Sequence, residues 1–182
     1  MVIGDKDAPV EIIEYAAISC PHCATFHDEV LPELKTKYLD SGKAKLIYRN
    51  YIFDNPFDVF ASILTRCVPE KKFFSTVQVF FNNQHIWNNI PVLREIFEEK
   101  GREAAIEYAR GEVTRTGKIA GITGQEAEAC FANQNVVNYL LKIRQTAYEG
   151  KGIRSIPTIL VNGKIMESND IEAISKAIED AN

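Results

Sequence analysis

The segment that most constrains the fold is the junction around Cys20-Pro21-His22-Cys23, where the spacing of apolar residues changes its period. Before it, residues 8–18 (APVEIIEYAAI) are apolar and β-branched over a short length, which predicts a strand buried on both faces. After it, residues 24–39 carry apolar side chains at steps of three and four, which predicts an amphipathic helix. A buried strand therefore leads directly into a helix, with two cysteines at the first turn.

Pro21 fixes the start of that helix, because a proline at the first helical position loses no hydrogen bond and already has a helical φ. Cys20 is then the N-cap residue, and its sulfur lies where the free N–H groups of His22 and Cys23 point. These groups, the helix dipole and a positive charge on His22 can lower a cysteine pKa from about 8.5 to roughly 3.5–7.5. We expect Cys20 to be the exposed nucleophile and Cys23 the buried resolving cysteine. Because the reduced thiolate is stabilised, the disulfide is an oxidant.

Two other interpretations compete with a redox centre. A zinc site would need two further ligands, although no second CxxC and no HxxxH motif accompanies the first. The side chains that could supply those ligands are Cys67, Cys130, His27 and His85. A purely structural disulfide would close so small a loop that it would remove little chain entropy. The motif and its context favour redox chemistry, with no metal ion and no cofactor beyond the Cys20–Cys23 disulfide.

Two further segments predict the rest of the sheet. Residues 43–53 (KAKLIYRNYIF) follow a Ser-Gly turn and predict a second strand, parallel to the first because a helix connects them. Residues 158–161 and 164–166 flank Asn162-Gly163, a strong signal for a two-residue hairpin. Residues 170–180 predict a closing helix with isoleucines on one face. The order of elements is β-α-β, a long interruption, and then β-β-α.

The interruption has helical spacing of apolar residues throughout. Within it, Thr123 and Glu126 have the spacing of a capping box, which marks the start of one helix. We therefore predict an α/β domain formed by residues 1–55 and 151–182, with an all-helical insertion at residues 56–150.

Charge and hydropathy exclude several classes of protein. The formal net charge of −4 argues against a nucleic-acid-binding protein, which needs a basic surface. The longest apolar runs are far shorter than the roughly 18–20 residues that cross a bilayer. The N-terminal MVIGDKDAPV lacks the basic and apolar regions of a signal peptide, so we expect either a cytosolic protein or the mature form of an exported one. Four cysteines, an even number, are compatible with an oxidising compartment.

Four features follow one another along nearly the whole chain: GDKDAPVEIIEY, the CPHC motif, the helical block, and IRSIPTILVNGK. In this combination the chain resembles the thiol-disulfide oxidoreductases of the DsbA family, which have a thioredoxin fold with an inserted helical domain. A strongly lowered cysteine pKa is a known property of that family. The resemblance implies an α/β, thioredoxin-like fold with an inserted all-helical domain, and a redox-active Cys20–Cys23 pair.

The resemblance also implies roles for residues outside the motif. It implies a cis Ile156–Pro157 peptide bond facing the cysteines, where free backbone groups pair with an extended substrate segment. It makes Arg154 a candidate for favouring the thiolate or contacting substrate. From the residues alone, a trans proline and a plain surface arginine are the alternatives.

Glu14 is a further candidate, six residues before Cys20 on the predicted strand. The resemblance places it beneath the disulfide, where a buried carboxylate could exchange a proton with Cys23. From the residues alone, a solvent-facing glutamate is the alternative.

The basic partner that this family often provides for the buried acid is missing at its matching position. That position holds Tyr48, and Arg49 points to the opposite face of a regular strand. His27, four residues after Cys23, is interpreted as an exposed helix residue, and no partner is predicted for it.

Cys67 and Cys130 both fall in the helical block. One interpretation is two buried free thiols that pack like small apolar residues. The other is a disulfide, because nearby thiols pair in an oxidising compartment, and some bacterial relatives of DsbA have a second disulfide in the helical domain. We favour the Cys67–Cys130 disulfide.

The resulting hypothesis is a monomeric dithiol oxidase of the periplasm that donates its disulfide to secreted or periplasmic proteins while they fold. Its partners would be unfolded proteins that contain cysteine, and a membrane protein of the DsbB type that reoxidises it. The first alternative is a disulfide isomerase or reductase that uses reduced Cys20, and a more distant one is a zinc-dependent binding module.

Overall fold

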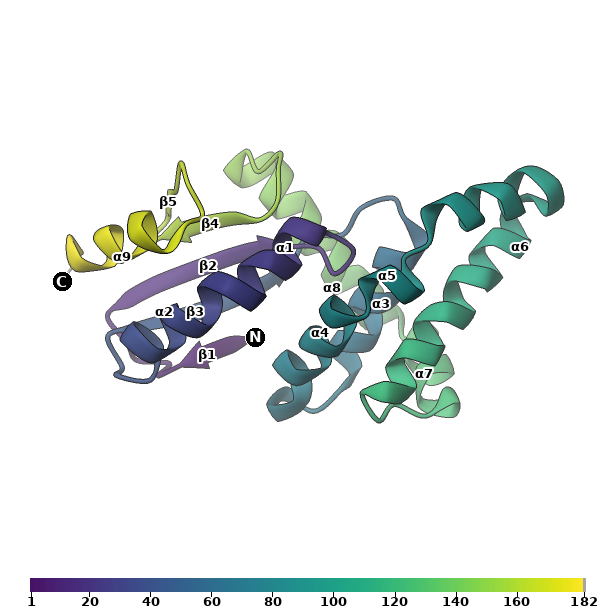
Figure 1. Cartoon of the computed structure of the whole chain (residues 1–182), viewed down its shortest axis with the longest axis horizontal. Helices are drawn as coiled ribbons and strands as arrows, with labels where there is room; N and C mark the ends of the chain where they lie inside the picture. Colours follow the sequence, from purple (N-terminus) through teal and green to yellow (C-terminus); the bar gives the residue numbers. More distant parts are fainter. Residues whose placement is uncertain (182) are drawn as a thin grey trace. The chain divides into compact units, whose positions relative to one another are not determined.

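The computed structural model describes residues 1–181, and the chain forms two compact units (Figure 1). The first consists of Met1–Tyr51 together with the segment from Gln145 to the C-terminus, and the second of Ile52–Arg144. Within residues 1–181, no helix combines the length and the apolar character that a membrane span requires.

The unit boundaries lie a few residues before the expected ones at 55/56 and 150/151. The backbone N–H of Tyr51 donates to Ala16 at 2.8 Å, which ties the chain to the sheet up to that point. On the return, the backbone N–H of Ile153 donates to Ala147 at 3.0 Å, so the end of the long helical stretch already belongs to the first unit.

The first unit is built on one mixed sheet of five strands in the order β1-β3-β2-β4-β5. β2 and β3 are parallel, which confirms the predicted β-α-β arrangement, and the other neighbouring pairs are antiparallel. The central strand β2 is almost entirely buried, as expected of a strand that is apolar on both faces. The strands are β1 (Val2–Gly4), β2 (Val10–Ala16), β3 (Ala44–Asn50), β4 (Thr158–Val161) and β5 (Lys164–Ile165).

The sequence does not predict β1, because three residues at a sheet edge carry no periodic pattern. Gly4, at its end, has a φ of +94°. A Cβ atom at this position would lie only 2.9 Å from the carbonyl oxygen of Ala44, so a glycine is required where β1 turns away beside β3.

The helix predicted over residues 24–39 begins at Pro21 and continues to Leu39, with two widened turns. Pro32 lacks an N–H group and its ring crowds the carbonyl four residues earlier, which accounts for the first widened turn. The segments are α1 (Pro21–Thr25), η1 (Phe26–Val30), α2 (Leu31–Leu34) and η2 (Lys35–Leu39).

The hairpin between β4 and β5 confirms the Asn-Gly prediction. Asn162 and Gly163 have φ values of 45° and 82°, as a type I′ turn requires. The closing helix α9 (Ile171–Glu179) begins at Asp170, whose side chain accepts a hydrogen bond from a backbone N–H of the first turn.

The second unit is all-helical and packs around large aromatic side chains. Phe57, Phe80 and Trp87 are fully buried with their rings edge to face, and Trp87 Nε1 donates to the carbonyl of Phe80 at 2.8 Å. Its helices are α3 (Pro56–Cys67), η3 (Glu70–Lys72), α4 (Phe73–Asn82), α5 (Gln84–Trp87), α6 (Ile90–Ile119, interrupted at Gly101), α7 (Gly124–Phe131) and most of α8 (Gln134–Gln145). The helical turn that follows α8, η4 (Thr146–Gly150), belongs to the first unit.

Candidate redox site

The cysteine pair lies at the end of β2 and the start of α1. Cys20 has extended backbone angles (φ −85°, ψ 119°) and is the N-cap residue, and Pro21 occupies the first helical position, which confirms the predicted helix start. Both cysteines are free thiols; Cys20 is partly exposed, whereas Cys23 is fully buried. An incoming thiol or disulfide can therefore reach Cys20 but not Cys23.

The two thiols have opposite electrostatic environments. A hydrogen bond from Cys23 to the Cys20 sulfur, backbone N–H groups of Cys23 and His22, and the charge of His22 together lower the pKa of Cys20 from 9.0 to about 7, against the effect of its burial. Burial raises the pKa of Cys23 strongly, and the negative charges of Cys20 and Glu14 raise it further. Above about pH 7 the pair thus consists mainly of a reactive Cys20 thiolate and a protonated Cys23.

The loop before β4 lies against the exposed sulfur. The Ile156–Pro157 peptide bond is cis, and the carbonyl oxygen of Ile156 lies 3.9 Å from Cys20 Sγ. Beside this contact the surface is hollowed by about 390 Å³, between the first turns of the long helix and the loop. The hollow is lined by His22, Phe26 and Val30 on one side and by Ser155, Pro157 and Asn169 on the other.

Arg154, expected to favour the thiolate or contact substrate, is held by η4. Its Nη1 donates to the carbonyl oxygens of Tyr148, at 2.5 Å, and Ile153, at 3.2 Å. Its guanidinium carbon lies 3.5 Å from the centre of the Tyr148 ring, a cation–π contact. The arginine fixes the start of the cis-proline loop, and its contact with substrate remains a prediction.

Glu14 is completely buried in the middle of β2, as the resemblance implied. Both of its carboxylate oxygens face one nitrogen: His27 Nε2 lies 3.1 Å from Oε1 and 3.0 Å from Oε2. His27 is itself only 4% exposed, so this pair lies inside the first unit, behind the cysteines.

The prediction that His27 is exposed is wrong. His27 follows Cys23 by four residues, so ordinary helical spacing places it on the same face of the helix as the buried Cys23. A polar residue on that face requires a polar partner, and Glu14 is that partner. The spacing from Cys23 was the sequence signal that could have placed His27 on the buried face.

The neighbouring strand behaves as predicted. Tyr48 is paired with Glu14 in the sheet register and is fully buried, and its ring lies edge-on to that of His27 at 5.7 Å. Arg49 is paired with Tyr15 instead and points to the other face, where its charge opposes the rise that burial causes in the pKa of Tyr15. The basic partner of Glu14 therefore comes from the helix and not from β3.

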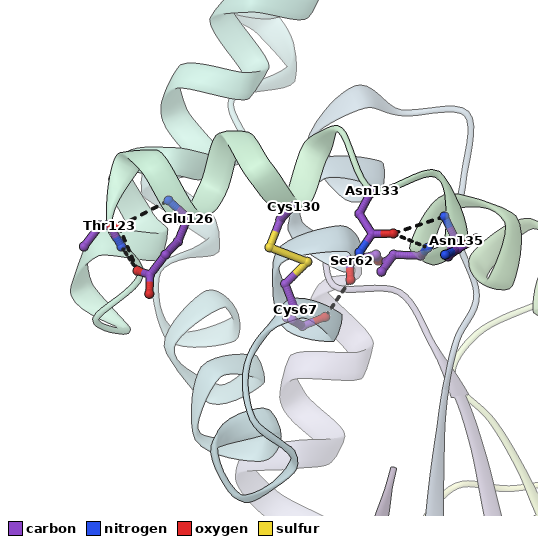
Figure 2. Close-up of a disulfide and its surroundings, with 9 residues drawn as sticks. Ser62, Cys67, Thr123, Glu126, Cys130, Asn133 and Asn135 are labelled. Carbon is purple, nitrogen blue, oxygen red and sulfur yellow. Dashed lines mark hydrogen bonds between the residues drawn. A yellow bond between two sulfur atoms is a disulfide. The ribbon is translucent and has the colours of Figure 1, made fainter.

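In the second unit, Cys67 and Cys130 form a disulfide between the end of α3 and α7 (Figure 2), with their Cα atoms 6.0 Å apart. The bond packs against the buried Ile63 and Leu140. Figure 2 also shows the predicted capping box, in which Thr123 Oγ1 accepts from the backbone N–H of Glu126 at 3.2 Å and the Glu126 carboxylate accepts from the backbone N–H of Thr123 at 2.7 Å.

These contacts weaken the zinc alternative. Cys67 and Cys130 are bonded to each other, and His27 is hydrogen-bonded to Glu14, so three of the four side chains that could supply the two further zinc ligands have other partners. Over the part of the chain that the structure describes, no three His, Cys, Asp or Glu side chains are grouped as a metal site requires.

The sequence matches a known protein family and known relatives. The family described as Thioredoxin matches residues 1–180. A protein of Rickettsia bellii, assigned as a protein-disulfide oxidoreductase, is 29% identical over 182 residues, which are 100% of this chain and 64% of that protein. The chain thus spans less than two thirds of the length of this relative.

Two crystal structures match almost the whole chain. One, of a protein-disulfide isomerase from Novosphingobium aromaticivorans, has a TM-score of 0.85 at 19% identity and covers 100% of this chain and 96% of its own. The other, of Wolbachia pipientis alpha-DsbA1, has a TM-score of 0.78 at 21% identity and covers 99% of this chain and 89% of its own. At these identities the likeness shows a common fold.

Proposed function

We propose that this chain, which belongs to the thioredoxin family and to its DsbA-type protein-disulfide oxidoreductases, works as a dithiol oxidase. The observation that carries the proposal is the asymmetry of the cysteine pair. Cys20 is accessible and has a pKa of about 7, whereas Cys23 is buried and has a raised pKa. Cys20 Sγ is therefore the sulfur that a substrate thiolate can attack. Cys23 Sγ is the leaving sulfur, which then holds a proton.

The reaction moves two electrons from substrate to enzyme. A substrate thiolate attacks Cys20 Sγ in the Cys20–Cys23 disulfide, the S–S bond breaks, and Cys23 leaves and is protonated. A second substrate thiolate then attacks the substrate sulfur of the mixed disulfide and displaces Cys20 as a thiolate. The substrate has gained a disulfide, and the enzyme holds a thiolate and a thiol.

The direction of electron flow follows from the stability of the leaving thiolate. Because the hydrogen bond from Cys23 and the backbone N–H groups at the start of α1 stabilise the Cys20 thiolate, the reduced enzyme is favoured over the oxidised one, and its disulfide is readily transferred. An ordinary cysteine pair without this stabilisation would be a weaker oxidant.

The cis-proline loop supports a binding mode for unfolded substrates. The Ile156 carbonyl lies beside Cys20, at the edge of the hollow formed with His22 and Phe26. An extended segment with its cysteine at Cys20 would pair with the backbone of this loop, which makes Ile156 and Pro157 substrate-binding residues and is compatible with many sequences. Arg154 would contribute by holding the loop through η4.

The proposed oxidase acts in the periplasm and is returned to its disulfide form by a membrane partner of the DsbB type. The reduced Cys20 thiolate is also a nucleophile toward wrongly paired disulfides, so isomerase activity is the alternative outcome of the same test.

The test compares two forms of one model protein that needs disulfides to be active. Oxidised enzyme should restore activity to the fully reduced form at stoichiometric amounts, and reduced enzyme should be much less effective on the scrambled form. Faster recovery of the scrambled form would replace the oxidase proposal with an isomerase.

A further inference from the structure

We propose that His27 is a positioning residue for the resolving half of the reaction: it donates from Nε2 to both oxygens of Glu14 and so holds a buried carboxylate ready to exchange a proton with Cys23. The proposal rests on the dithiol chemistry proposed above, but it does not depend on the direction of electron flow.

The geometry defines what each partner does. An ionised carboxylate has only hydrogen-bond acceptors, so while Glu14 is ionised the nitrogen between its oxygens, at 3.1 and 3.0 Å, carries the proton. With Nε2–H directed at both oxygens, the carboxylate plane of Glu14 is fixed. Burying a carboxylate without such a donor would cost folding free energy. The completely buried Glu14 therefore requires a hydrogen-bond donor, and His27 is in position to be that donor.

The two residues flank the cysteine motif on both sides in sequence. Glu14 is on the central strand β2, which leads into the motif, and His27 is one helical turn beyond Cys23 on the same buried face. The Glu14 charge acts on Cys23, because it is one of the causes that raise the pKa of that thiol. The carboxylate and its donor thus form one buried pair within the first unit, on the strand and the helix that flank the resolving cysteine.

At the positions paired with Glu14 in the sheet, the two neighbouring strands carry neither lysine nor arginine. β3 presents Tyr48 next to Glu14, and its neighbour Arg49 faces the opposite side of the sheet. β4 presents Ile159 opposite Glu14 in the register. The hydrogen-bond donor to Glu14 therefore comes from the helix, through His27.

Protons and electrons balance in both directions. When Cys23 leaves the disulfide as a thiolate, protonated Glu14 gives it the proton, and the resulting carboxylate accepts Nε2–H on both oxygens. When Cys23 later attacks a mixed disulfide on Cys20, Glu14 takes the Cys23 proton on one oxygen, and the other oxygen keeps its bond to Nε2–H. The electron pair stays on sulfur throughout, and His27 is the donor in both states.

The test separates the step at Cys20 from the step at Cys23. Reduced enzyme is mixed with oxidised glutathione; formation of the mixed disulfide depends on Cys20, and its resolution, which releases glutathione, depends on Cys23. His27→Phe removes the donor but retains a ring, and should slow resolution about 10-fold or more, with a changed pH profile, while the first step is unchanged. His27→Gln retains an N–H donor and should restore much of the rate.

A double-mutant cycle and a control complete the experiment. If His27 acts through Glu14, then His27→Phe added to Glu14→Gln should cause no further slowing. His85→Phe, at an exposed histidine of α5, should change neither step.

Equal resolution rates in wild type and His27→Phe across the pH range, or effects of Glu14→Gln and His27→Phe that multiply, would overturn the proposal. If His27→Phe does not fold, the same cycle with His27→Ala and the rescue by His27→Gln decide the question. A reduction potential like that of thioredoxin would defeat the oxidase proposal and leave these rates unaffected, so the two failures are distinguishable.

Discussion

The two cysteine pairs of this chain contain the same atoms in opposite settings. Cys20 and Cys23 are separated by two residues at the start of a helix, one exposed and one buried, and the helix end favours a thiolate. Cys67 and Cys130 are 63 residues apart, join two helices, and pack against apolar side chains. The position of a cysteine pair in the fold, and not the cysteine itself, therefore decides whether the pair transfers electrons or stabilises the folded chain.

Removing one sulfur from each pair should give the largest contrast in activity. Cys20→Ser should lower the rate of oxidation of a dithiol peptide by at least about 10³-fold, because Cys23, the other cysteine outside the second disulfide within residues 1–181, is buried and cannot form the mixed disulfide. Cys67→Ala with Cys130→Ala should retain most of that rate. The contrast fails if the double variant is as inactive as Cys20→Ser while still folded.

When stability is measured instead of activity, the Cys67–Cys130 bond should matter more than the Cys20–Cys23 bond. Closing a loop of 63 residues restricts the unfolded chain, so loss of the Cys67–Cys130 bond should lower the free energy of unfolding by about 4 kcal/mol in denaturant titrations. Reduction of Cys20–Cys23 should have the opposite sign, because the folded reduced form gains a stabilised thiolate. An unchanged denaturation midpoint in Cys67→Ala/Cys130→Ala would contradict the structural role.

The pH dependence of stability should also distinguish the Cys20–Cys23 pair from the Cys67–Cys130 pair. Cys20 has a folded pKa of about 7, below its ordinary value of 9.0, so the unfolded reduced chain binds the extra proton between these pH values. The contribution of Cys20 to the stability of the reduced protein should therefore grow from pH 7 to pH 9 and be lost as pH falls through 7, with a change of at most about 2.7 kcal/mol; above pH 9 the raised pKa of Cys23 acts in the opposite direction.

The oxidised protein provides the control for this slope, because its cysteines do not titrate. Denaturation of both forms at several pH values, together with thiolate absorbance of the reduced form, checks the prediction. Parallel stability curves for the two forms between pH 7 and 9 would rule it out.

The smallest effect is expected at His22, whose charge is the last of the causes that lower the pKa of Cys20. His22→Ala should raise this pKa only slightly, because the Cys23 hydrogen bond and the backbone N–H groups remain. Alkylation rates of Cys20 as a function of pH measure the shift. A return of the pKa to 9.0 would mean that the histidine, and not the helix start, controls the thiolate.

The sequence predicts those features of the fold and of the redox site that depend on residues close together along the chain. The helix start at Pro21, the Asn162-Gly163 turn and the capping box at Thr123 are local, and the structure confirms them. The cis bond before Pro157 follows from family resemblance alone, because a trans bond is the physical default.

What sequence did not predict depends on tertiary contacts. β1 exists only because β3 lies beside it, and the partner of Glu14 is known only once the helix is laid against the sheet. His27 was misjudged although its spacing from Cys23 indicated the buried face, since no rule of sequence reveals that a buried histidine has a carboxylate to meet.

The reduction potential of Cys20–Cys23, measured by equilibration in glutathione buffers, tests the proposed oxidase function most directly. Stabilisation of the Cys20 thiolate predicts a potential well above the roughly −270 mV of thioredoxin, toward the roughly −120 mV of a strong dithiol oxidant, in wild type and in His22→Ala alike. A value near −270 mV would contradict the claim that this helix start makes the disulfide an oxidant.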